Sequence, residues 1–90
     1  MPNLNRLTSE SAVFRRACVT QPVCTPSRSA ILTGVYPHTT GCTADNTILP
    51  PDVACLPEML RESYATGYYG KWHLGDEVLR QHGFDDWRSI

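Results

Sequence analysis

The chain is 90 residues long and carries eight Lys and Arg residues against nine Asp and Glu residues, a formal net charge of −1. A chain of this length forms one small domain at most, and its balanced charge lacks the basic stripe or acidic tail typical of nucleic-acid or membrane-surface binding. No apolar run approaches the ~20 residues of a membrane span, and nothing near Met1 resembles the apolar segment of a secretory signal.

The N-terminal part predicts one helix and one strand. Residues 2–13 carry apolar side chains at helical spacing, and Pro2 suits a first helical turn, so we expect a short helix there. Residues 13–19 resemble a strand. Residues 21–23 are expected to be extended, because a residue that precedes proline avoids the α region.

The middle of the chain predicts two helices around a loop. The first helix is expected to start at about Pro26 and to end at Gly34, since glycine commonly closes a helix. Residues 36–52 are rich in turn-forming residues and predict a surface loop. Residues 56–62 give the clearest amphipathic helix, with apolar side chains on one face.

The C-terminal part predicts a strand over residues 66–73 that leads into a loop, and one or two helical turns over residues 76–82, closed by Gly83. Helices and strands in alternation indicate an α/β fold with a sheet flanked by helices. Only two strands are convincing, fewer than such a sheet needs, so the chain is expected to be part of a larger domain. The aromatic residues expected to pack in the interior are Tyr68, Tyr69, Trp72 and Trp87.

Four cysteines, Cys18, Cys24, Cys42 and Cys55, show no Cys-x-x-Cys pair, and no histidine pair stands at zinc-finger spacing. Three disulfide connectivities stay open. Cys18, Cys42 and Cys55 are interpreted as buried or otherwise ordinary thiols. Cys24 differs because of its neighbours.

Residues 24–28 read Cys-Thr-Pro-Ser-Arg and place a sulfur and a fixed positive charge at a helix N-terminus, where backbone N–H groups favour anions. A cysteine-dependent phosphatase would need arginine at position 30, which is Ala30. A papain-like protease would take its base from His38 or His73, but the sequence lacks that family's neighbours around the cysteine. A third interpretation is a structural cysteine beside a surface arginine.

The same residues resemble the signature Cys-x-Pro-Ser-Arg of the type I sulfatases, members of the alkaline-phosphatase-like superfamily whose motif cysteine is oxidised to formylglycine. A second family signature, ending in Gly-Lys-x-His, appears at residues 70–73, with Ser63 in place of the usual glycine before tyrosine. The resemblance runs along nearly the whole chain, since further similar segments lie at residues 2–7, 33–34, 36–38, 45–46 and 49–52.

This resemblance implies a role for four residues. Cys24 would be converted by a formylglycine-generating enzyme, and the hydrated aldehyde would attack the sulfur of a sulfate ester. Arg28, one helical turn later, would hold a diol oxygen. Lys71 and His73 would lie on one side of a strand, where Lys71 contacts a sulfate oxygen and His73 bonds the diol or its ester. Cys24, Arg28, Lys71 and His73 are thus the expected catalytic residues, and Lys71 and His73 also bind substrate.

The resemblance also implies a divalent cation, usually calcium, with residue 24 among its ligands once it is formylglycine. The family's other metal ligands lie upstream and downstream of the matching segment. Asp45-Asn46 and Asp85-Asp86 look like metal-binding pairs, but their order relative to the signatures is wrong, so they are given no role. His38 and His82 are given none either. Residues 1–90 are therefore expected to be a partial N-terminal catalytic domain that is inactive alone.

Two rival interpretations stay open, namely a phosphonate or phosphate ester hydrolase of the same superfamily and a non-catalytic chain or pseudoenzyme. The expected partners are a sulfate ester and the formylglycine-generating enzyme, with no nucleic acid and no membrane span. The resemblance implies a periplasmic, secreted or lysosomal location, and the sequence itself indicates none.

Overall fold

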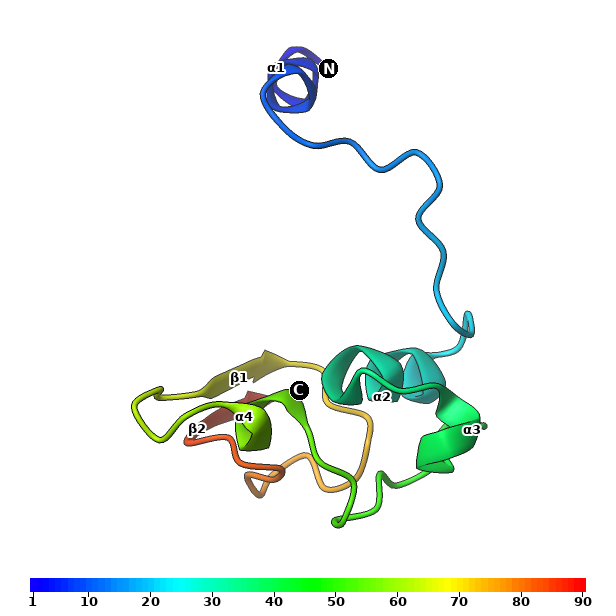
Figure 1. Cartoon of the computed structure of the whole chain (residues 1–90), viewed down its shortest axis with the longest axis vertical. Coiled ribbons are helices and arrows are strands. Elements are labelled where there is room, and N and C mark those ends of the chain that lie inside the picture. Colours follow the sequence, from blue (N-terminus) through cyan, green and yellow to red (C-terminus); the bar gives the residue numbers. More distant parts are fainter.

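The computed structural model describes all residues from 1 to 90. Figure 1 shows one body of short helices beside a small sheet, and a separate helix at the end of an extended N-terminal segment. In chain order the elements are α1 (Pro2–Ser9), α2 (Cys24–Thr33), α3 (Pro37–Thr40), α4 (Leu56–Met59), β1 (Gly67–Gly70) and β2 (Asp86–Ser89).

The two strands pair in parallel, with Gly67 opposite Asp86 and Gly70 opposite Ser89. Helices combined with a parallel strand pair confirm the expected α/β class. Strand β1 is shorter than the predicted residues 66–73, and β2 forms where no strand was predicted. None of the helices is long and apolar enough to cross a membrane.

The predicted strand over residues 13–19 is wrong, because these residues form turns and irregular backbone and are all exposed. A strand requires a neighbour that satisfies its backbone N–H and C=O groups, and no other segment pairs with this one. Its larger apolar side chains, Val13, Phe14 and Val19, are at least half exposed.

Helix α1 ends at Ser9 rather than at residue 13. The hydroxyls of Thr8 and Ser9 donate to the carbonyls of Leu4 and Arg6, at 2.8 and 2.7 Å, and such local bonds compete with helix continuation. No residue of α1 is buried, so no packing extends the helix against that competition.

Three further predictions need correction. The predicted helical turns over residues 76–82 are absent, because Asp76 Oδ1 accepts the N–H groups of Val78 and Leu79 in a local turn. Helix α4 stops at Met59 instead of residue 62, since the next residue is extended. The loop over residues 36–52 contains the short helix α3.

Helix α2 confirms the predicted end at Gly34, whose φ of 73° is the left-handed conformation that glycine adopts readily. The helix begins at Cys24, two residues before the predicted start. Pro26 is tolerated there because an amide in the first turn needs no helical partner. The buried face of α2 carries small hydroxyl side chains, and Ser29 meets Thr40 of α3 at 3.5 Å.

The core lies between α2, the sheet and the connecting loops. Its six buried members are Cys42, Leu49, Cys55, Trp72, Leu74 and Trp87. Trp72 makes edge-to-face contacts with Tyr68 and Trp87, each at 5.1 Å between ring centroids. The predicted packing role is confirmed for Tyr68, Trp72 and Trp87, but it is wrong for Tyr69, whose side chain is exposed.

All four cysteines are free thiols. Cys42 and Cys55 are buried, and Cys18 is exposed. Burial, with the nearby Glu58 carboxylate and Cys42 thiol, raises the pKa of Cys55 to about 11. The packing of Trp72 and Leu74 in the core fixes the position of the loop that follows β1, beside the start of α2.

Candidate active site around Cys24

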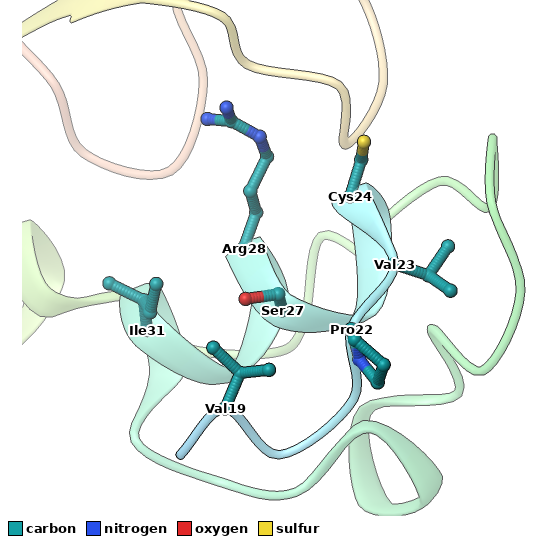
Figure 2. A pocket seen from close by; sticks show the side chains of 7 residues that line it. All are labelled: Val19, Pro22, Val23, Cys24, Ser27, Arg28 and Ile31. Atoms are coloured by element: carbon teal, nitrogen blue, oxygen red, sulfur yellow. The ribbon is translucent and has the colours of Figure 1, made fainter. Parts of the chain in front are cut away.

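Cys24 is the first residue of α2, and its side chain is exposed. Figure 2 shows the side chains of Cys24 and Arg28 projecting from the same side of α2, as expected for residues one helical turn apart. They share an open cavity of about 360 Å³ with Val19, Pro22, Val23, Ser27 and Ile31.

Arg28 joins α2 to the loop after β1. Its Nη1 donates to the carbonyl of Lys71 and approaches the Tyr68 hydroxyl at 3.4 Å. The Tyr68 hydroxyl donates to the same carbonyl. Since a guanidinium carries five N–H donors, Arg28 keeps others free for an anion in the cavity.

His73 approaches Cys24 from the same loop. One ring nitrogen of His73, one carboxylate oxygen of Asp45 and the Cys24 sulfur all lie within 4.8 Å of one another. The Nε2 atom of His73 is 2.7 Å from Asn46 Oδ1, and its Nδ1 atom is 3.7 Å from Asp45 Oδ1. The imidazole is thus oriented through Nε2, while Nδ1 faces the Asp45 carboxylate without a hydrogen bond.

The backbone around His73 is irregular, with a φ of 57° in the left-handed region. The Glu77 carboxylate holds it there by accepting the N–H of His73 at 2.7 Å and that of Trp72 at 3.3 Å. The carbonyl of His73 accepts the Thr25 hydroxyl at 2.9 Å, which ties the loop to the first turn of α2.

This irregular backbone corrects one step of the sequence argument. Lys71 and His73 follow the end of β1 at Gly70, so strand alternation does not set their directions. Hydrogen bonds to Glu77 and Thr25 place the loop instead.

The charges at the site favour ionised carboxylates. The backbone N–H of Thr25 holds the pKa of Asp45 below its usual value against the opposing effect of burial, and the Thr25 hydroxyl, His73 and Lys71 act in the same direction. Lys71 is exposed, and its positive charge acts on the same carboxylate. Burial opposes ionisation of Glu77, yet hydrogen bonds from Ser89, His73 and Trp72 lower its pKa.

The four residues singled out from the sequence therefore gather around one end of α2. His38 lies apart from them and stacks on Tyr36, with ring centroids 5.6 Å apart. The sequence analysis gave no role to Asp45 and Asn46, which lie beside His73, and it overlooked the contacts that Thr25 and Glu77 make with the same loop.

The start of α2 explains the position of Asp45. Helix α2 begins after Val23, which has no side-chain oxygen to accept a first-turn N–H, so an acceptor must come from elsewhere in the chain. Asp45 supplies it, accepting the N–H and the hydroxyl of Thr25 at 3.2 Å each. Nothing in the local pattern indicates Glu77.

The residues near Cys24 do not fit calcium. Calcium takes six to eight oxygen ligands. The cluster offers one thiol, one imidazole and one carboxylate, and that carboxylate already accepts two bonds from Thr25. Replacing the thiol by diol oxygens would still leave the set short.

Comparison with known proteins assigns the family. The family model described as Sulfatase matches residues 1–89. The chain is 39% identical to an ulvan-active sulfatase of Formosa agariphila over 99% of its own length and 19% of the relative. It is 36% identical to the human N-acetylgalactosamine-6-sulfatase over 96% of its length and 20% of the relative. An N-acetylgalactosamine-6-O-sulfatase of Bacteroides thetaiotaomicron is 44% identical over 82% of this chain and 16% of the relative.

The chain thus spans about a fifth of the length of the first two relatives. No solved structure matches it significantly. Since the family model covers all but the last residue, the chain belongs to the sulfatase family.

Proposed function

We propose that the protein to which these residues belong hydrolyses sulfate esters, with Cys24 converted to formylglycine as the nucleophile. One observation carries this proposal: the Cys24 sulfur lies within 4.8 Å of a His73 ring nitrogen and shares a cavity with Arg28, in a chain that matches the sulfatase family over residues 1–89. In this proposal the four residues supply the nucleophile and half of its anion-binding shell, within a partial N-terminal catalytic domain of the alkaline-phosphatase-like superfamily.

The sulfur of Cys24 marks where the oxygens of the hydrated aldehyde would stand. One hydroxyl oxygen attacks the ester sulfur, the bond from sulfur to the alcohol oxygen breaks, and the alcohol leaves with a proton. The second hydroxyl then loses its proton, the carbonyl re-forms, and the carbon–oxygen bond to sulfate breaks. This covalent route divides one difficult displacement into two easier steps.

The neighbouring side chains suit these steps. Arg28 has N–H groups free to hold a diol oxygen, and the exposed ammonium of Lys71 can meet a sulfate oxygen. His73 is oriented by Asn46 and lies beside Asp45, so it can bond the diol or its sulfate ester and pass a proton. The chain's own residues do not make a calcium site, and no step here is assigned to the ion.

Conversion of Cys24 is tested by intact-mass and peptide analysis of protein made together with a formylglycine-generating enzyme, in air so that dioxygen serves as the oxidant. We expect a loss of about 18 Da confined to the peptide with Cys24, whereas ordinary thiol oxidation adds oxygen. The variant Arg28→Lys, which alters the motif but keeps the charge, and Cys18→Ser serve as controls. An unmodified Cys24 would favour the non-catalytic interpretation.

The reaction is tested on the full-length protein with matched aryl sulfate and aryl phosphonate esters. We expect the higher kcat/KM for the sulfate, and a preference for the phosphonate would move the assignment to the rival hydrolase class. The 90-residue chain assayed alone with calcium should give background rates, because it brings together too few metal ligands. Clear turnover by the isolated chain would contradict that part of the proposal.

A further inference from the structure

A second group of metal-binding donors lies outside the Cys24 site. The Cys55 sulfur, a carboxylate oxygen of Glu58 and a ring nitrogen of His82 lie within 4.8 Å of one another. His82 Nδ1 lies 3.7 Å from Glu58 Oε2. These residues come from two segments, the start of α4 and the turn before β2.

Burial distinguishes this group from a chance surface cluster. Cys55 is completely buried, and the His82 side chain is only 5% exposed. Its Nδ1 atom is buried and has no hydrogen-bond partner. Buried polar atoms usually have a partner, so this nitrogen, beside a carboxylate and a thiol, is available to bind a ligand.

The backbone holds the three donors in place. Cys55 stands at the N-cap of α4, and its N–H donates to Glu58 Oε2 at 2.8 Å, which fixes the carboxylate beside the thiol. His82 has a φ of 49°, and Gly83 follows at 77°. A Cβ on Gly83 would come within 2.7 Å of Glu58 Cγ, so only glycine lets the two segments approach this closely.

We propose that Cys55, Glu58 and His82 bind a zinc ion. Thiolate, imidazole and carboxylate are the ligands that zinc accepts in proteins. With Zn–N and Zn–O bonds of about 2.0–2.2 Å, a tetrahedral nitrogen–oxygen pair lies roughly 3.3–3.5 Å apart, so the 3.7 Å between His82 Nδ1 and Glu58 Oε2 requires only a small approach of the two side chains. Calcium and magnesium, which prefer oxygen ligands, do not suit this set.

Water can complete the coordination. Glu58 and His82 line an open cavity of about 490 Å³ together with Asp76 and Gln81, which gives solvent access to these two ligands. The ion would tie α4 to the turn that leads into β2.

The test uses Co²⁺ as a spectroscopic substitute for zinc in the full-length protein carrying Cys24→Ala, which removes the thiol of the Cys24 cluster. We expect one equivalent of Co²⁺ to give a sulfur-to-metal charge-transfer band and intense visible bands typical of tetrahedral sites. One equivalent of Zn²⁺ should abolish both, and Mg²⁺ or Ca²⁺ should not.

Two ligand variants and one control complete the test. Cys55→Ser should abolish the charge-transfer band, and His82→Asn should weaken Zn²⁺ binding by more than about 100-fold, beyond what changes to outer groups cost. Asparagine tolerates the left-handed backbone at this position, so His82→Asn isolates the loss of the ring nitrogen. Cys18→Ser, which removes an exposed thiol, should change nothing.

The proposal is independent of the sulfatase chemistry, because none of its three residues contacts the Cys24 site. Absence of a charge-transfer band, or a band that survives Cys55→Ser, would overturn it. A band lost equally in Cys18→Ser would also overturn it. Circular dichroism with and without Zn²⁺ shows whether binding accompanies folding, and a metal-dependent gain of structure that requires Cys55 supports the site.

Discussion

The first 20 residues and the rest of the chain follow different physical rules. In the N-terminal segment every residue is exposed, and α1 stands apart from the body in Figure 1. In the body, short elements of four residues persist because loops and aromatic side chains pack around Trp72. Local sequence preference alone therefore sustains α1, whereas tertiary contacts sustain α3, α4 and both strands.

This contrast also separates two kinds of cysteine. Cys18 is an exposed thiol in the N-terminal segment. Cys24 begins α2 and lies beside His73 and Arg28. We expect Cys24 to be the reactive cysteine, because only there do a helix N-terminus, a guanidinium and an imidazole lie close together.

The difference between Cys24 and Cys18 is tested most directly by replacing each of them with serine in the full-length protein. We expect Cys24→Ser to lower kcat by more than about 1,000-fold, since a sulfated serine has no second hydroxyl with which to expel sulfate. Cys18→Ser should leave kcat unchanged. Steady-state assays with an aryl sulfate measure both, and equal losses would refute the assignment of Cys24 as nucleophile.

A second prediction concerns stability. Trp72→Ala removes the side chain at the centre of the aromatic cluster and should destabilise the protein by about 3–5 kcal/mol. Phe14→Ala removes an equally apolar side chain that is 83% exposed, and should change the free energy of unfolding by less than about 0.5 kcal/mol. Urea denaturation measures both, and a large effect of Phe14→Ala would show that the N-terminal segment packs on the body.

The sequence predicted the features that depend on local preferences and failed on those that depend on a distant partner. The end of α2 at Gly34 and the packing of Trp72 and Trp87 were predicted correctly, since each depends on a local conformational preference or on side-chain size. The strand over residues 13–19 was wrong and β2 was missed, because pairing depends on a partner that no local pattern reveals.

In the candidate site, too, local spacing was predictable from the sequence and tertiary hydrogen bonds were not. Cys24 and Arg28 share a face because helical spacing requires it. Lys71 and His73 reach the site through a bond network instead of strand alternation, so their grouping was predicted for the wrong reason. Glu77 was missed because its role arises only when the loop folds back on it.

A third prediction tests that network. Glu77→Gln removes the charge that accepts the N–H groups of Trp72 and His73, and the amide places a donor beside them. We expect kcat of the full-length protein to fall by about 10- to 100-fold, as small displacements of catalytic groups do. Because Glu77 does not reach the cavity beside Cys24, KM should change little.

The matched control is Glu62→Gln, an exposed glutamate without hydrogen bonds in the structure. A positioning role for Glu77 also predicts a shifted pH profile, because the imidazole of His73 would sit differently beside Asp45. An unchanged profile with lower thermal stability would instead show that Glu77 only supports the fold.

The smallest expected effect is a loss of thermal stability at low pH, caused by Asp85. The backbone N–H and the hydroxyl of Thr66 lower the pKa of Asp85 from its usual 3.8, against the effect of burial, and Arg80 adds to this. Because the folded state has the lower pKa, the unfolded chain binds more protons as pH falls through this range. The stabilisation is therefore complete above the unfolded-state pKa and is lost as pH falls through the folded-state value.

Melting temperatures measured between about pH 2.5 and 6 should consequently fall toward acid, and Asp85→Asn should flatten the lower part of that curve. Asp85 is exposed, so solvent screens the effect and keeps it small. Glu10→Gln, in the N-terminal segment, should leave the curve unchanged because its side chain makes no hydrogen bond. The hydrogen bonds between Thr66 and Asp85 join the residue before β1 to the residue before β2. If Asp85→Asn left the curve unaltered, these bonds would add nothing to the stability of the sheet.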